Sequence, residues 1–170
     1  MQRKYFVAAF LSAIALGQSL PASAEEPSNQ RDLLKALSGA KVTLQQGMEA
    51  SAKSGKPISA KFELDNGALQ LSVYTAKSGK FNEVVVDHGS GKVAKVEQIK
   101  EGGDLSHARA QAGALANTKQ SLRAAADKAE HDNPGYRTVS LTPASESKHT
   151  VVQVVLAKGE ETKTVSEALE

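Results

Sequence analysis

The hydrophobic residues of the chain first follow a helical period. Leu44, Met48 and Ala52 recur at every fourth position, which predicts a helix with one apolar face. Thr43 and Gln46 match the capping box, in which two side chains satisfy backbone donors at the start of a helix. The sequence therefore predicts a helix that begins at Thr43 and presents a hydrophobic stripe to a neighbouring layer.

After Pro57 the spacing of hydrophobic residues changes from four to two. Ile58, Ala60, Phe62 and Leu64 alternate with polar residues, as in a strand with one buried face. Turn-forming residues separate three further alternating segments, at residues 69–73, 81–87 and 93–97. Consecutive hairpins with one apolar face predict an antiparallel meander, covered by the preceding helix.

A looser copy of this order occupies the second half of the chain. Residues 105–130 are rich in alanine with an intermittent helical stripe, and their pattern leaves open whether they form one helix or two. Thr118 takes the place that Thr43 has in the first half, and a cap there favours two helices. Three strand candidates follow, at residues 136–142, 150–157 and 161–165. We therefore expect an α+β protein of two tandem units, residues 31–101 and 102–170, each with a helix packed on an antiparallel β-meander.

The run from Val84 to Asp87, followed by Gly91-Lys92-Val93, resembles the PepSY family of exported bacterial domains. Residues 40–43 with the helix after them, and the strand at residues 58–64, also match that family. The resemblance covers residues 31–98, whereas residues 104–170 match only in the order of elements and form a degenerate copy. It implies a helix packed on a curved antiparallel sheet, similar to parts of the propeptides of secreted metallopeptidases. It also implies a partner, namely an exported peptidase or a peptide segment, which the chain would restrain or regulate by binding.

Residues 1–24 have the three parts of a secretory signal peptide. Arg3 and Lys4 precede an apolar run, and Ala22-Ser23-Ala24 is typical of a cleavage site. The run is shorter than the roughly 20 residues that a membrane-spanning helix needs. We therefore expect cleavage between Ala24 and Glu25, a periplasmic or secreted product without stable membrane insertion, and a flexible leader at residues 25–30.

Charge and cysteine content narrow the possible functions. The chain has 21 Lys and Arg against 19 Asp and Glu, and removal of Arg3 and Lys4 with the signal balances the two. Lysines alternate with acidic residues instead of forming a stripe, which argues against nucleic acid as a partner. Because cysteine is absent, stability must come from a hydrophobic core rather than from disulfides.

No residue pattern of a catalytic, cofactor or metal site is recognisable. The spacing of the four histidines does not match the i, i+4 pair of a helical zinc site; they are His88, His107, His131 and His149. Residues 89–92 lack the spacing of a phosphate-binding loop and are predicted to form a hairpin turn. We therefore assign no catalytic, cofactor-binding or metal residues, and no cofactor.

The sequence thus favours a non-enzymatic binding module. Such a module would present a sheet edge or a hairpin loop, because backbone groups on an edge strand give affinity without special side chains. The alternative is a periplasmic sensor or carrier of a metal or small ligand that uses the scattered histidines and carboxylates.

Overall fold

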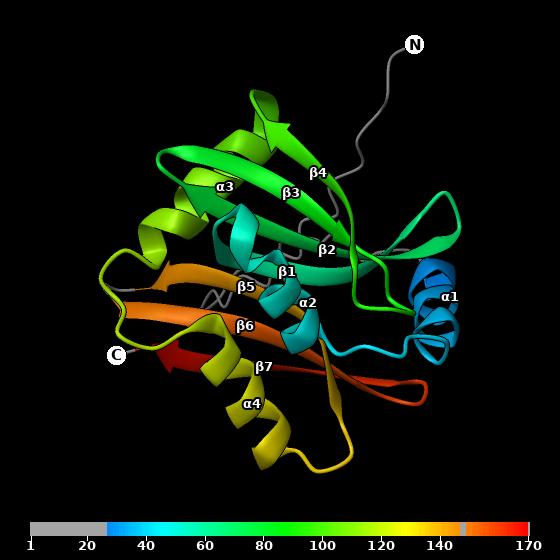
Figure 1. Cartoon of the computed structure of the whole chain (residues 1–170). Helices are drawn as coiled ribbons and strands as arrows, with labels where there is room; N and C mark the ends of the chain where they lie inside the picture. Colours follow the sequence, from blue (N-terminus) through cyan, green and yellow to red (C-terminus); the bar gives the residue numbers. More distant parts are fainter. Residues whose placement is uncertain (1–26, 147–148, 170) are drawn as a thin grey trace.

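The computed structural model describes residues 27–146 and 149–169, which fold into four α-helices and one seven-stranded antiparallel sheet (Figure 1). The predicted signal peptide lies outside the described residues. The helices are α1 (Pro27–Leu37), α2 (Leu44–Ser51), α3 (Gly102–Ala114) and α4 (Leu122–Asp132), with a short 3₁₀ turn η1 (Ala52–Ser54) after α2. The strands are β1 (Lys56–Asp65), β2 (Ala68–Lys77), β3 (Lys80–Val86), β4 (Val93–Ile99), β5 (Arg137–Glu146), β6 (His149–Lys158) and β7 (Glu161–Leu169).

The strand order is β4-β3-β2-β1-β5-β6-β7, so two meanders lie side by side in one sheet. They meet where β1 pairs with β5, at Ala60 with Leu141 and Lys61 with Ser140. The α+β class and the antiparallel pairing predicted from the alternating segments are confirmed. The strands of the second half extend further than the pattern indicated, to Glu146 in β5 and to Leu169 in β7.

The two faces of the sheet differ in polarity and in the helices that cover them. One face carries the hydrophobic residues and packs against α2 and α4 (Figure 1). Its fully buried members include Leu71, Val73, Val84, Val86, Leu141, Val152 and Val154. The other face, called the polar face below, carries mainly polar residues on β1 and β2 but also valines such as Val151 and Val155 on β6. α3 lies across its centre, where Ser59 Oγ donates a hydrogen bond to Gln111 Oε1 at 2.8 Å.

The predicted capping box of α2 is confirmed. Thr43 Oγ1 accepts a hydrogen bond from Gln46 N at 3.2 Å, and Thr43 N donates to Gln46 Oε1 at 2.8 Å. Leu44 and Met48 are buried, as the helical stripe predicts. The prediction is wrong for Ala52, which is exposed because α2 ends at Ser51 and the chain tightens into η1.

The alanine-rich region forms two helices, but the predicted cap at Thr118 is wrong. The N-cap of α4 is Ser121, whose Oγ accepts a hydrogen bond from Ala124 N at 3.2 Å. Thr118 instead lies just beyond the end of α3, where its hydroxyl donates to the carbonyl oxygen of the C-cap residue Leu115 at 3.1 Å. A hydroxyl can satisfy free groups at either end of a helix, and the sequence did not distinguish the two cases.

At the other end of the chain, α1 begins at Pro27 and includes residues 27–30, which the sequence assigned to a flexible leader. Proline is well tolerated in the first turn of a helix, because its missing N–H would have no helical partner there.

Candidate interaction surface

Strand β4 forms one edge of the sheet, and no strand among the described residues pairs with its outer side (Figure 1). The tight turn that connects β3 to β4 fixes the position of this edge strand. Asp87 Oδ1 accepts hydrogen bonds from Ser90 N at 2.7 Å and from Ser90 Oγ at 2.6 Å, and Asp87 N donates to Lys92 O at 2.8 Å. These Ser90 hydrogen bonds lower the pKa of Asp87. Gly91, at a φ of 74°, allows the reversal that a side chain would strain. The sequence prediction of a turn at residues 89–92 is confirmed.

A β-bulge in β4 changes the direction of its side chains. Val84 pairs with Val96 and Val85 with Lys95, but Val86 pairs with Val93, so Ala94 is the extra residue. Two residues three positions apart would face opposite sides of a regular strand. The bulge instead places Val93 and Val96 on the same face as the buried Val84 and Val86, beyond the cover of α2.

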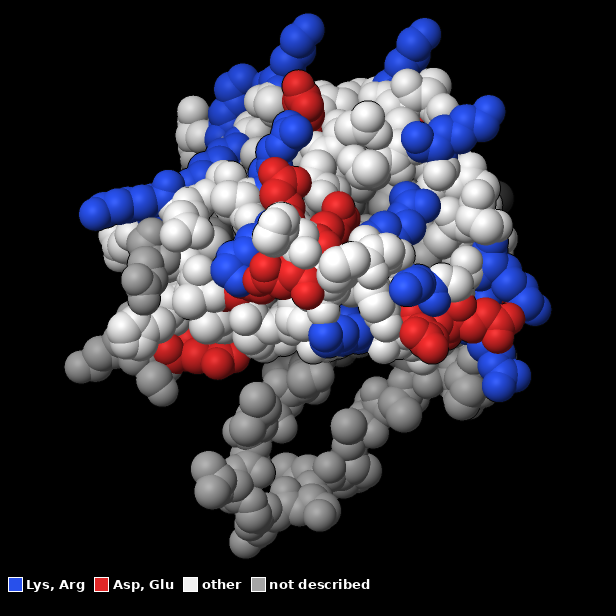
Figure 2. All heavy atoms as spheres, turned by 90° about the horizontal axis from the view of Figure 1, so that it is seen from below, with Lys and Arg blue, Asp and Glu red and all other residues white. Residues whose placement is uncertain are grey.

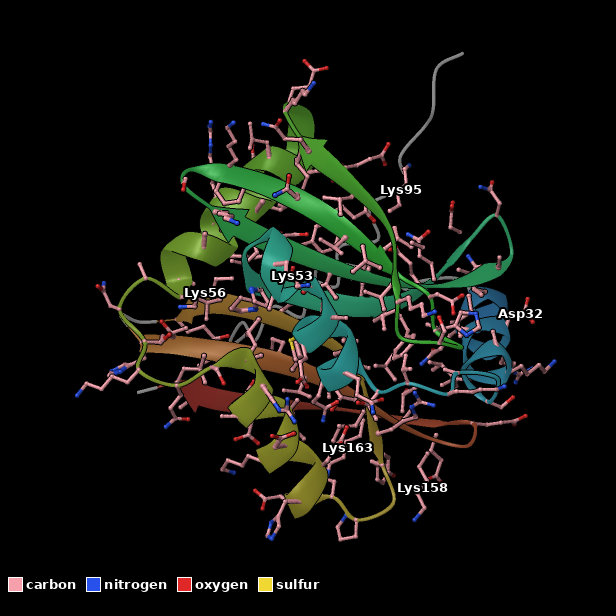
Figure 3. The ribbon with its side chains drawn as sticks, in the orientation of Figure 1. Asp32, Lys53, Lys56, Lys95, Lys158 and Lys163 are labelled. Atoms are coloured by element: carbon pink, nitrogen blue, oxygen red, sulfur yellow. The ribbon has the colours of Figure 1, made fainter. Side chains whose placement is uncertain are left out.

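Val93 and Val96 are 42% and 48% exposed, and they are the exposed large hydrophobic residues of the described chain. On the opposite face of β4, Lys95 Nζ lies 2.7 Å from Glu97 Oε2, with both side chains close to half exposed. Figure 3 shows Lys95 beside β4 and Lys163 near the other edge of the sheet. The edge therefore combines accessible apolar groups on one side with a charged pair on the other.

A hydrogen-bonded polar cluster occupies the neighbouring part of the polar face. Gln70 Nε2 donates to Ser72 Oγ at 2.8 Å, and Ser72 Oγ donates to Glu83 Oε1 at 3.0 Å. Burial raises the pKa of Glu83 above its ordinary value, although the Ser72 hydrogen bond opposes this shift. Glu97 of β4 pairs in register with Glu83 and raises its pKa further. The cluster holds one carboxyl group in a partly desolvated position, where it accepts a hydrogen bond from the Ser72 hydroxyl.

Tyr74 lies at the inner end of this polar face. The Nζ atom of Lys61 is 5.8 Å from the centre of its ring, a cation–π arrangement. Burial, together with the carboxylates of Glu83, Glu63 and Asp104, raises the pKa of the Tyr74 hydroxyl. Tyr74 is therefore protonated at neutral pH and packs within the molecule, next to α3.

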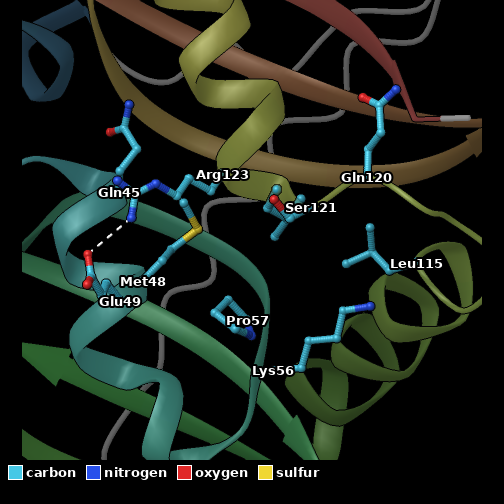
Figure 4. A pocket seen from close by; sticks show the side chains of 10 residues that line it. Gln45, Met48, Glu49, Lys56, Pro57, Leu115, Gln120, Ser121 and Arg123 are labelled. Carbon is cyan, nitrogen blue, oxygen red and sulfur yellow. Dashed lines mark hydrogen bonds and ion pairs between the residues drawn. The ribbon is translucent and has the colours of Figure 1, made fainter.

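A cleft of about 350 Å³ lies between α2, the start of β1 and the segment that joins α3 to α4 (Figure 4). Met48, Pro57, Leu115 and Leu122 give it an apolar lining. Arg123 at its rim forms an ion pair with Glu49, with Arg123 Nη1 and Glu49 Oε2 3.1 Å apart. The hydroxyl of Ser121 caps α4 as an acceptor and is not placed beside a base. The cleft offers hydrophobic volume without a recognisable reactive group.

The four histidines lie apart from one another. His88 is in the turn before β4, His107 is on α3, His131 is near the end of α4, and His149 starts β6. Within residues 27–146 and 149–169, no three His, Cys, Asp or Glu side chains come together as they would around a metal ion. The histidines that the alternative interpretation relied on therefore do not converge in this part of the chain.

Val93 and Val96 were not among the residues predicted from the sequence to form a site. The available signal was the spacing Val93-Ala94-Lys95-Val96, in which two valines three apart break the period of two. An interruption of that kind in an otherwise regular strand is a mark of a bulge.

Charges on the face that bears α4 are mixed. Figure 2 shows acidic and basic side chains interspersed there, and several pair with one another, such as Arg123 with Asp127 and Lys128 with Asp132. No helix in the described residues is both long and apolar enough to span a membrane.

Comparison with known proteins gave no relative: no protein-family model, no curated protein and no solved structure matches the chain.

Proposed function

We propose that this chain is a non-enzymatic binding module that takes up an extended segment of a partner protein along β4. The observation that carries the proposal is the edge itself: its outer backbone is unpaired in the described chain, and it carries the exposed Val93 and Val96. Backbone hydrogen bonds from an added strand supply affinity, while side-chain positions on alternate faces supply selectivity. An exposed apolar edge without such a use would promote aggregation, so natural proteins normally protect it.

The bulge at Ala94 limits where a segment can add. Bulges interrupt regular pairing and are one way in which proteins protect their edges. This one lies at the second residue of β4 and leaves Lys95–Ile99 regular. The added strand would therefore pair with these five residues, and its apolar side chains would lie next to Val96 on the face that also bears Val93.

The resemblance to PepSY domains supplies the expected partner, an exported peptidase that the module restrains. In this proposal the signal peptide is removed after Ala24 and the module acts in the periplasm.

The helices and strands form two tandem units whose strands join in one sheet. Similar placement of α2 over β1–β3 and of α4 over β5–β7 supports this view of the architecture. We do not propose a metal-sensor function, because the histidines of the described residues do not come together around a common point.

Site-specific photo-crosslinking in the source cells tests the proposal. Val96 is replaced by p-benzoyl-phenylalanine, and the matched control places the same residue at Ser166, an exposed position of the opposite edge strand β7. We expect position 96, and not position 166, to form an adduct with an extended segment of an exported protein, identified by mass spectrometry. That protein is then assayed for peptidase activity with and without the chain. Equal adducts at both positions, or no adduct with another protein at position 96, would overturn the proposal.

A further inference from the structure

We infer that a second copy of this chain pairs with β4 when no partner segment occupies it. This inference rests on the proposed function only in that both use the outer side of β4. The inference goes beyond the proposed function by naming a second occupant of β4 and a form of regulation. The dimer blocks the edge that the partner protein needs. Two copies related by a twofold axis would join their sheets through antiparallel β4 strands.

The order of residues in β4 carries the inference. Antiparallel pairing centred on Val96 places Lys95 opposite Glu97 of the second copy, and Glu97 opposite Lys95 of the second copy. Directly opposed residues of an antiparallel pair have β-carbons about 5 Å apart, close enough for ion pairing. Lys95 and Glu97 already share one face and pair within a single chain. The dimer would join two such pairs into a network of four alternating charges.

The same register also brings apolar side chains of the two copies together on the other face of the strand. Val96 would lie against Val96 of the second copy, on the face that is nearly half exposed in the single chain. No other register of this short strand opposes both charged residues with a residue of opposite sign. The structure thus contains a self-complementary edge, with charge matched on one face and valine matched on the other.

The geometry predicts a weak dimer. Regular pairing would extend over few residues because Ala94 is bulged, and Lys92 and Lys100 at the ends of β4 would face each other with like charge. Such an edge contact buries much less than the ~1,200 Å² typical of stable interfaces. We therefore expect a dissociation constant above about 1 μM, so that a partner segment can displace the second copy.

Charge reversal followed by mixing tests the inference. Lys95→Glu places a second glutamate opposite Glu97, and Glu97→Lys places a second lysine opposite Lys95. Each variant alone should therefore dimerise at least about tenfold more weakly than the native chain. An equimolar mixture of the two variants restores opposite charges at both positions. It should form heterodimers in sedimentation velocity and native mass spectrometry. The double variant K95E/E97K should dimerise like the native chain.

The controls separate loss of pairing from loss of folding. Lys163→Glu reverses a charge on the opposite edge strand and should leave dimerisation unchanged, and circular dichroism checks that every variant is folded. The inference is overturned if the purified native chain remains monomeric at millimolar concentration, or if the mixture fails to assemble. In that event an adduct of Val96 with another exported protein would still support the proposed function. A native dimer without such an adduct would leave the inference standing and remove the proposed function.

Discussion

Gly47 of α2 lies against Leu71 of β2 so closely that a β-carbon on residue 47 would come within 2.5 Å of Leu71 Cδ2. Leu71 is fully buried in the core, so its side chain can make room only by displacing other packed residues. Glycine inside a helix costs about 1 kcal/mol relative to alanine. The close approach of the helix to the sheet explains why this position nevertheless has no side chain.

Gly47→Ala should therefore destabilise the protein by about 1 to 2 kcal/mol, because overpacking outweighs the gain in helix propensity. Leu71→Ala alone should cost about 2 to 5 kcal/mol. The double variant should be more stable than the sum of the two single effects predicts, because the smaller side chain at position 71 makes room for the added methyl group at position 47. Urea unfolding followed by circular dichroism measures all three. Additive effects would show that the two residues are not in contact.

Arg137 connects β5 to the segment between α1 and α2. Its guanidinium donates to the carbonyl oxygens of Leu37 and Val42, both at 3.1 Å, and lies 5.3 Å from the centre of the Phe62 ring. Burial lowers its pKa, although an arginine stays charged at neutral pH.

Arg137→Met keeps most of the hydrocarbon stem and removes both hydrogen bonds, so the free energy of unfolding should fall by about 2 kcal/mol. The matched control is Arg123→Met, which breaks an exposed ion pair with Glu49 and should cost less than about 1 kcal/mol. Thermal and urea unfolding of both variants give the comparison. Equal losses would contradict a structural role for Arg137.

The carboxyl group of Glu83 makes the stability of the protein depend on pH. Its pKa is raised in the folded state, mainly by burial, so the folded protein binds a proton more tightly than the unfolded chain does. The stability of the folded state must then fall as pH rises from the ordinary value of 4.5 through the raised pKa.

Glu83→Gln keeps an acceptor for the Ser72 hydroxyl and removes the charge. The variant should therefore be more stable than the native chain at pH 7, and the difference between the two should shrink toward pH 4. Urea unfolding at a series of pH values measures this difference in stability. Because the other titrating groups are the same in both proteins, the difference reports on Glu83. A constant difference across the series would show that Glu83 does not titrate in this window.

The sequence predicted the local elements well because each depends on nearby residues. The capping box at Thr43 and the hairpin turns involve residues close in the chain. One such turn is formed by Asn66 and Gly67, at φ values of 51° and 80°. Thr118 shows the limit of this reasoning: its hydroxyl bonds backward to Leu115 rather than forward to a helix, and both uses fit the same local pattern.

What the sequence could not predict depends on contacts between distant residues. The pairing of β1 with β5, which joins the meanders, has no marker in either strand. Arg137 reaches carbonyl groups almost 100 positions earlier in the chain, and nothing in its own segment indicates this. The exposed edge at Val93 and Val96 was missed for a different reason, because a bulge is visible in the sequence only as a break in alternation.

The junction of β1 with β5 has a mechanical consequence. Its backbone register is limited to Ala60 with Leu141 and Lys61 with Ser140, whereas the hairpins on either side are paired along most of their length. Tension applied to the two ends of the chain should therefore part the sheet at its middle before either hairpin opens. A force–extension trace would then record the molecule lengthening in two steps instead of one.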